Sequence, residues 1–457
     1  MRKIKFPHGF LWGAATSAYQ IEGAERNEGR SESIWDRFSR APAATKDGQT
    51  GAVACDHYNR YRQDVELMRD MGLQAYRFSV AWPRVVPDGR GAVNPNGLDF
   101  YSRLVDTLLE HGIEPFVTVY HWDLPQVLED AGGWTNRDTV AAFVEYTHAV
   151  SRHLGDRVKQ WITHNEPWCQ SHLGYRTGLH APGRRDWPSA LSAGHHLLLS
   201  HGLAVPVIRE NARDAKVGIA LNMSPGLPAS PSLEDYEAYR HFDGMLNRWF
   251  LDPLYRGSYP ADIVADYMRM EHVPASGLPF VQPGDLKTIT APIDFLGINY
   301  YSRTIVRSEA IPEHRNHPRT VTIAPQSELT DMGWEVYPHG LFEVLARTSL
   351  EYGVPNLYVT ENGASYGRGP DADGRVRDTA RVEYLRDHLV ATKKAIDAGA
   401  PVRGYFVWSL LDNFEWDRGY TQRFGIVWTD YETQTRIAKD SSHWYGQVIA
   451  ENGVGLE

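Results

Sequence analysis

Eight short apolar segments, separated by longer amphipathic stretches, restrict the fold of this chain more than any other feature. Each is rich in β-branched or aromatic residues, as buried parallel strands are. Two of the intervening stretches, 61–72 and 98–112, have helical patterning and end in glycine, a common helix stop. Alternating strands and helices predict an α/β fold, a (β/α)8 TIM barrel. The segments begin at Phe10, Ala75, Glu114, Val158, Lys216, Ile293, Asn356 and Val402.

Two polar, Gly- and Pro-rich segments, 302–337 and 364–377, follow the sixth and seventh predicted strands. Their place after strand ends indicates long βα loops and not linkers between domains. The chain has no repeat of fixed period and no low-complexity tract. We therefore expect a single catalytic domain over residues 1–457.

Composition excludes several classes of function. The net charge of −10 argues against a nucleic-acid partner, which would require basic patches. The start of the chain has no sustained apolar core, and no window holds 18 apolar residues, so we expect neither a secretory signal nor a membrane span. Two distant cysteines, Cys55 and Cys169, form no disulfide framework, which favours a reducing, cytoplasmic location. The sequence leaves open whether the chain forms a homo-oligomer.

Acidic residues end two of the predicted strands. The fourth ends in Asn165 and Glu166 within "WITHNEPW", and the seventh ends in Glu361 within "YVTENG". A barrel brings all eight carboxyl ends to one mouth. Two carboxylates at one mouth indicate glycoside hydrolysis, in which one is the acid and the other the nucleophile or base. The alternative is that each pairs with an arginine or caps a helix; the second glutamate favours chemistry.

The surroundings of the two glutamates differ in the sequence. Arg77, inside the second predicted strand, is always charged and would keep a neighbouring nucleophile ionised. Its alternative role is a structural ion pair under the barrel floor. Glu166 lies beside Trp168 in a more apolar stretch, and such a carboxyl holds its proton longer, as an acid must.

Metal and cofactor chemistry have little support in the sequence. Among 19 histidines, His195 and His196 are adjacent and His121 lies near Asp123, but no H-E-x-x-H motif or other ligand spacing appears. No Gly-rich dinucleotide motif follows a strand either. We expect no cofactor and no metal; a metal-dependent barrel isomerase is the alternative, and a chelator would reveal it.

The chain resembles glycoside hydrolase family 1, the β-glucosidase family, over essentially its whole length. The opening "FLWGAATSAYQIEG" is similar to the family's N-terminal signature, "WITHNEPW" to its acid/base motif and "YVTENG" to its nucleophile motif. "GINYYS" and "WSLLDNFEW" are similar to its sugar-binding segments. The resemblance implies a retaining mechanism. Glu361 attacks the anomeric carbon, and Glu166 protonates the leaving oxygen and then activates water.

The same resemblance implies the roles of further residues. His164 departs from the aliphatic residue or phenylalanine expected there; strand alternation directs it away from Asn165 and outside the lumen. Phe424 and Trp122 have an alternative role as core residues. The implied contacts to the non-reducing sugar are Gln20, His121, Trp122, Asn165, Glu415 and Trp416, with Trp408 as stacking floor and Phe424 as a wall. Asn299 and Tyr301 would lie near the nucleophile, with Tyr301 and Arg77 bonded to Glu361; the aglycone-side candidates are Trp168, His180, Asn222 and Trp334.

The leading hypothesis is a β-glucosidase acting on small-molecule β-glycosides, namely cellobiose-like oligosaccharides and aryl β-glucosides. Relatives that cleave 6-phosphorylated glycosides need a cationic clamp, whereas Glu415 would repel a phosphate. Thioglucosidase-like relatives lack the acid/base glutamate, and a non-catalytic sugar-binding barrel would lack one of the two. Preference among glucose, galactose and fucose stays open.

Overall fold

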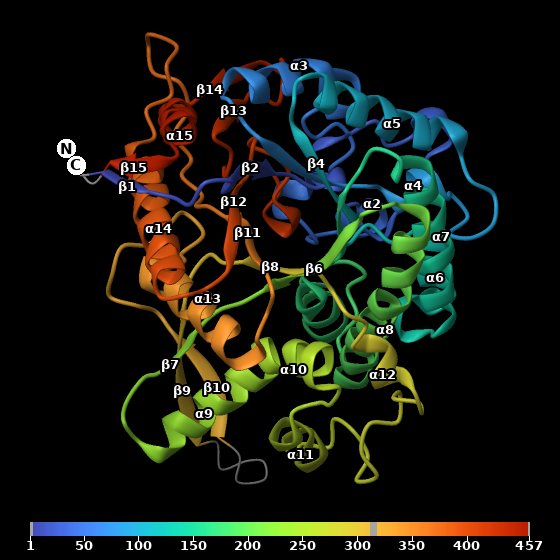
Figure 1. Ribbon diagram of the computed structural model, residues 1–457. Helices are drawn as coiled ribbons and strands as arrows, with labels where there is room; N and C mark the ends of the chain where they lie inside the picture. The colour runs from blue at the N-terminus through green and yellow to red at the C-terminus, as the bar shows by residue number, and fades with distance from the viewer. Residues whose placement is uncertain (1–2, 311–317, 456–457) are drawn as a thin grey trace.

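The computed structural model describes residues 3–310 and 318–455, and its centre is a closed barrel of eight parallel strands (Figure 1). Each strand coincides with one of the eight predicted segments, the seventh extending one residue further to Asn362, so the predicted (β/α)8 barrel is confirmed. The strands are almost entirely buried because helices cover the barrel outside and side chains fill it inside. In barrel order they are β2 (Leu11–Ala15), β3 (Ala75–Ser79), β4 (Glu114–Tyr120), β5 (Gln160–Asn165), β6 (Lys216–Asn222), β8 (Phe295–Asn299), β11 (Leu357–Asn362) and β12 (Val402–Trp408).

Helices surround the barrel and build the connections between its strands (Figure 1). The longer ones are α3 (His57–Asp70), α5 (Pro95–Glu110), α7 (Asp138–Leu154), α8 (Trp187–Asn211), α9 (Leu233–Asp243), α13 (Pro338–Tyr352), α14 (Thr379–Asp397) and α15 (Asp440–Glu451). The shorter ones are α1 (Ala18–Ile21), α2 (Ile34–Ser39), α4 (Trp82–Val85), α6 (Gln126–Asp130), α10 (Trp249–Arg256), α11 (Ala261–Arg269) and α12 (Asp285–Ile289), together with a π-helical turn, Cys169–Thr177, directly after the fourth barrel strand.

Aromatic side chains fill the lumen of the barrel. Phe116 of β4 and Phe406 of β12 have ring centroids 4.8 Å apart, and Tyr358 lies 5.4 Å from Phe116 and 5.2 Å from Phe295. Such close aromatic packing excludes water from the centre of the barrel. The polar groups at the carboxyl ends of the strands therefore stand on a rigid apolar floor.

Helix α8 is the one stretch of the described chain that is long and apolar enough to cross a membrane by length and composition. In its most apolar window of 18 residues, 78% of the residues are buried within the protein. A helix that is apolar on all sides is expected where it packs inside a large protein. Burial against the barrel accounts for its composition.

The predicted excursion after the sixth barrel strand contains a hairpin that the sequence did not predict. Strands β9 (Thr304–Ala310) and β10 (Pro318–Ile323) pair antiparallel, and β7 (Gly226–Pro228) joins β9 to give a three-stranded sheet beside α9 (Figure 1). The segment 364–377 contains no helix or strand, all of its residues being described. Two small sheets complete the fold: β1 (Lys3–Lys5) with β15 (Gly453–Gly455), and β13 (Val427–Thr429) with β14 (Arg436–Ala438).

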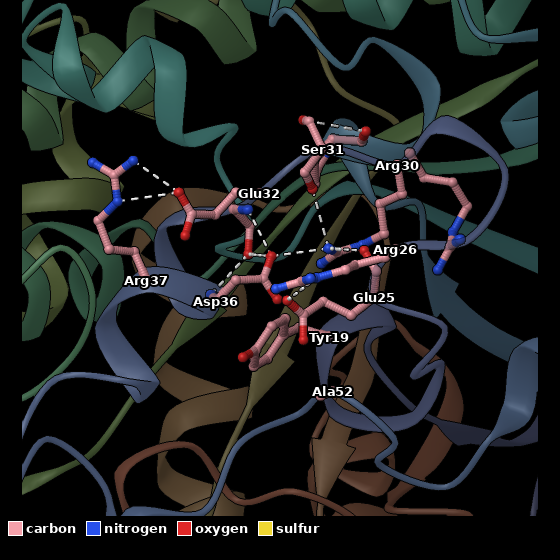
Figure 2. A network of polar contacts seen from close by, with 12 residues as sticks. Tyr19, Glu25, Arg26, Arg30, Ser31, Glu32, Asp36, Arg37 and Ala52 are labelled. Carbon is pink, nitrogen blue, oxygen red and sulfur yellow. Dashed lines mark hydrogen bonds and ion pairs between the residues drawn. The ribbon is translucent and has the colours of Figure 1, made fainter.

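A buried ion pair fixes the loop that leads into α2 (Figure 2). The α2 helix begins with a capping box, in which Ser33 and Asp36 bond to each other's backbone N–H. Arg30 donates from Nη1 to Asp36 Oδ2 over 2.9 Å, and both side chains are buried. The pair supports the mouth of the barrel, because Trp35 of α2 packs against Trp416 with ring centroids 4.5 Å apart.

Candidate active site

A cavity of about 750 Å³ opens at the carboxyl ends of the barrel strands. Its size is within the range of small-molecule sites. Glu166 and Glu361 both line it. The other predicted residues that line it are His121, Trp122, Trp168, His180, Asn222, Asn299, Tyr301, Trp334, Trp408, Glu415, Trp416 and Phe424.

The Glu361 carboxylate has a hydrogen-bond donor on each oxygen. Arg77, fully buried on β3, donates from Nη1 to Oε1 over 2.5 Å, and the Tyr301 hydroxyl donates to Oε2 over 2.5 Å. Arg77 thus pairs with a carboxylate at the cavity and not with one under the floor. Charge-assisted bonds of this kind stabilise the ionised carboxylate.

Two asparagines link the two carboxyl groups. Asn165 Oδ1 accepts from Arg77 Nη2 over 2.6 Å and from Asn299 Nδ2 over 2.9 Å. Asn299 Nδ2 also donates to Glu166 Oε1 over 2.7 Å. One continuous network therefore runs from Glu166 through Asn299, Asn165 and Arg77 to Glu361. We name these five residues the carboxyl network.

Glu166, directly after β5, has an unusual backbone conformation, with a φ angle of 47°. Non-glycine residues in this left-handed region are uncommon and gather at functional sites. The conformation ends the strand, and Pro167 and the π-helical turn that follows redirect the chain. Burial, together with Glu166, raises the pKa of the Cys169 thiol well above its usual range, so a neutral thiol neighbours the carboxyl.

The two carboxyl groups hold their protons to different extents. Burial and the neighbouring Glu361 charge raise the pKa of Glu166 to about 8. Burial raises the pKa of Glu361 as well, but Arg77 and Tyr301 counteract it. As pH rises, Glu361 therefore loses its proton before Glu166. The site can hold an acid and a nucleophilic carboxylate at the same time.

A third acidic residue, Glu415, lies at the deep end of the cavity. Gln20, fully buried on α1, donates from Nε2 to Asn413 Oδ1 over 3.1 Å and to Glu415 Oε2 over 3.3 Å. Burial and the nearby Asp417 raise the pKa of Glu415 to about 8. This end of the cavity thus offers the Glu415 carboxyl to hydroxyl-bearing ligands, with the buried Gln20 amide bonded behind it.

Aromatic rings and a neutral histidine surround the same end. The Trp408 ring lies 5.9 Å from that of His121, nearly parallel, and Trp122 lies 4.6 Å from Trp416. Burial and the Arg77 charge lower the pKa of His121 well below its usual range. His121 Nδ1 is buried and has no hydrogen-bond partner in the described part of the chain.

The four residues predicted for the aglycone side also line the cavity. Trp168 stacks on His172 with centroids 5.1 Å apart, and Trp334 lies 5.3 Å from Tyr301. His180 Nε2 is 3.5 Å from Asp417 Oδ1, an ion pair whenever the histidine is protonated. Asn222, at the end of β6, lines the cavity between these groups.

The remaining histidines of the sequence argument lie elsewhere. His195 bonds to Tyr259 and Asp285, and His196 bonds to the Trp134 carbonyl, all outside the cavity. Within residues 3–310 and 318–455 no group of three metal-ligating side chains is placed to hold a metal ion. His164 faces away from the lumen, as strand alternation predicts, and its Nε2 bonds to Ser200 of α8.

Several residues of the site were not predicted from the sequence. Two of these residues are Cys169, beside Glu166, and Asp417, beside Glu415. Because both are close in sequence to predicted residues, the spacing alone could have indicated them as candidates for the site. Ile305 and Ile323 of the β9–β10 hairpin also line the cavity. Nothing in the polar, irregular composition of their segment indicated that role.

An eight-stranded parallel barrel with two buried carboxyl groups facing an aromatic cavity defines a barrel glycosidase. The glycosyl hydrolase family 1 model matches residues 2–454, and the chain belongs to this family. Members of the family are retaining glycosidases. The predicted resemblance is confirmed, and the chain is a glycosidase.

Three similar proteins illustrate the relationship. Beta-glucosidase A of Acetivibrio thermocellus is 47% identical over 454 residues, covering 99% of this chain and 100% of the relative. A 1,4-beta-D-glucan glucohydrolase of Thermotoga neapolitana is 47% identical, covering 98% and 99%. The family 1 β-glucosidase from Thermotoga maritima in complex with isofagomine lactam superposes with a TM-score of 0.94 at 47% identity, covering 99% and 100%.

Proposed function

We propose that this protein is a retaining β-glucosidase that removes terminal non-reducing β-D-glucosyl residues from cellobiose-like oligosaccharides and aryl β-glucosides. The observation that carries the proposal is the carboxyl network. It joins two carboxyl groups in one cavity and gives them unequal surroundings. The names of the similar enzymes, a β-glucosidase and a glucan glucohydrolase, support the substrate class.

In the first step Glu361 attacks the anomeric carbon, and Glu166 gives its proton to the departing oxygen. Arg77 and Tyr301 keep Glu361 ionised and aimed. Glu166 is protonated below about pH 8, so it is available as the acid at neutral pH. The products are a covalent glucosyl ester on Glu361 and a free alcohol.

In the second step Glu166 acts as the base. Once Glu361 is esterified it carries no charge, and one of the causes that raise the pKa of Glu166 disappears. The ionised Glu166 then takes a proton from water, which attacks the anomeric carbon and releases glucose. Two inversions give net retention of the β-configuration.

The deep end of the cavity supports glucose as the sugar. We infer that Glu415 and Gln20 bond the 4- and 6-hydroxyls, that His121 and Asn165 bond hydroxyls on the other edge, and that Trp408 lies under the ring. Above about pH 8, where Glu415 is ionised, it disfavours a 6-phosphate by charge repulsion. We also propose a cytoplasmic location, supported by two cysteines that are free and buried.

The test is the configuration of the first-formed sugar. Hydrolysis of an aryl β-glucoside, followed by proton NMR before mutarotation, should show β-glucose first. An initial α-anomer would mean inversion, which requires a wider separation of the carboxyl groups. It would overturn the roles given to Glu166 and Glu361.

A further inference from the structure

The outer half of the cavity is built differently from the inner half. On one side it is bounded by the β9–β10 hairpin, in which Ile305 and Ile323 are direct cross-strand partners. Directly opposite residues in an antiparallel pair project from the same face. Both side chains line the cavity and both are partly exposed. We name this pair the isoleucine ledge.

Strand alternation fixes which way the ledge faces. The next residue of β9, Val306, is fully buried and packs with Phe242 of α9 and Leu246 on the other face of the small sheet. Ile305 therefore projects to the cavity side, as period-two alternation requires. The ledge is held by the hairpin ladder and by α9, and does not depend on a ligand for its position.

Apolar side chains belong to the same cavity lining as the ledge. They include Met223, Pro325 and Met332. Arg303, which also lines the cavity, donates to both Glu335 oxygens over 2.6 and 2.9 Å, so its charge is compensated within the protein. A second glucose laid here would lose water from its hydroxyls and gain few partners, which is unfavourable.

We propose that the isoleucine ledge binds an apolar aglycone, so that the enzyme favours aryl and medium-chain alkyl β-glucosides over cello-oligosaccharides. The inference rests on the proposed β-glucosidase function and assigns its substrate class. Covering partly exposed isoleucine with aryl or alkyl carbon is favourable in proportion to the apolar area removed from water. Specificity arises because that gain is absent for a sugar aglycone.

The experiment compares octyl β-glucoside, below its micellar concentration, with cellobiose. Both leaving groups are alcohols that need protonation, so a difference in kcat/KM reports aglycone contacts. In wild type we expect kcat/KM to favour the octyl glucoside about tenfold or more. In the double variant Ile305→Asn, Ile323→Asn, we expect about a tenfold loss on the octyl glucoside and less than a twofold change on cellobiose.

The control is Leu329→Asn. Leu329 belongs to the same excursion, is 43% exposed and does not line the cavity, so both substrates should keep their wild-type values. Equal losses on both substrates in a folded double variant, or no octyl preference in wild type, would overturn the inference. If the double variant does not fold, a wild-type series from methyl to octyl β-glucoside decides, because log kcat/KM should rise with chain length.

The two proposals fail differently. An enzyme that cleaves methyl β-glucoside and cellobiose but shows no rise along the alkyl series keeps the β-glucosidase function and loses only the apolar aglycone. An enzyme that cleaves no β-glucoside in the panel contradicts the proposed function itself.

Discussion

Two of the buried arginine–carboxylate pairs, Arg30–Asp36 and Arg77–Glu361, differ in their location, because only the carboxylate of the second lines the cavity. Asp36 Oδ2 accepts from Arg30 over 2.9 Å (Figure 2). It also accepts from the Ser33 backbone over 2.6 Å and from the Ser33 hydroxyl over 2.8 Å. Glu361 accepts from Arg77 and from one tyrosine. Both pairs are almost fully buried.

The difference is in what lies beyond each pair. The Arg30–Asp36 pair ends in its own loop, where Arg30 also donates to the backbone carbonyls of Glu25 and Ser31. Arg77 continues through Asn165 to a second carboxyl group, Glu166, whose pKa is raised to about 8. A buried ion pair therefore has only a structural role unless a second carboxyl group, with fewer hydrogen-bond donors and cations around it, lies in the same cavity.

The largest effect that the comparison predicts follows the removal of Glu361. Glu361→Ala should lower kcat on every β-glucoside by about 10⁴-fold or more, because no covalent intermediate forms. Added azide should occupy the vacated space and give the α-glucosyl azide, identified by NMR. In Glu166→Ala the same anion should attack the glucosyl-enzyme and give the β-glucosyl azide. The same anomer from both variants would contradict the placement of one carboxyl on each side of the sugar.

Replacing the two arginines separates the two pairs. Arg77→Met and Arg30→Met should each cost about 3–5 kcal/mol in the free energy of unfolding, because each leaves a buried carboxylate unpaired. Only Arg77→Met should change the pH profile of kcat/KM. Its removal raises the pKa of Glu361, which must be ionised, and that of Glu166, which must be protonated. Both limbs should therefore move to higher pH, by about one unit for the acidic limb. A shifted pH profile of kcat/KM in Arg30→Met would contradict the conclusion that only the Arg77–Glu361 pair affects catalysis.

The contribution of Glu415 should depend on the hydroxyls of the substrate. At neutral pH, where Glu415 holds its proton, Glu415→Ser should cost about 0.5–1.5 kcal/mol in activation free energy on aryl β-glucosides for each hydrogen bond lost. On the 4-deoxy and 6-deoxy analogues the loss should be smaller, since fewer bonds remain to lose. The measurement is kcat/KM on all three substrates; equal losses would remove Glu415 from the sugar contacts.

The smallest effect is expected at the entrance. Trp168→Ala should raise the KM for cellobiose a few-fold with a smaller change in kcat, because stacking on the leaving sugar is made equally in ground state and transition state. A folded variant with an unchanged cellobiose profile would assign Trp168 to packing against His172.

The barrel and its two glutamates could be predicted from sequence because both follow from short-range patterns. Buried parallel strands are short apolar runs, and a barrel must gather their carboxyl ends, which places Glu166 and Glu361 together across the chain. The hairpin could not be predicted in this way. Ile305 lies in a segment of mixed polarity, and its role depends on pairing with Ile323 and on the packing of Val306, which are tertiary contacts.

The pair of His180 and Asp417 illustrates the same limit. His180 follows the fourth barrel strand and Asp417 the eighth, and neither stands in a spacing that indicates the other. Their proximity depends on the paths of two irregular loops. Loop paths are set by local backbone geometry and side-chain packing, which periodicity does not encode.

The carboxyl network also bears on how such an enzyme can change over generations. Residues joined by shared hydrogen bonds show strongly non-additive substitution effects, so a change at Asn165 or Asn299 is tolerated only in the background that keeps the other bonds. The isoleucine ledge is held by its own hairpin and shares no bond with that network. Substitutions should therefore be tolerated more readily at the hairpin than in the carboxyl network. A library randomised at Ile305 and Ile323 should change which leaving groups are accepted while the bond-breaking chemistry stays the same.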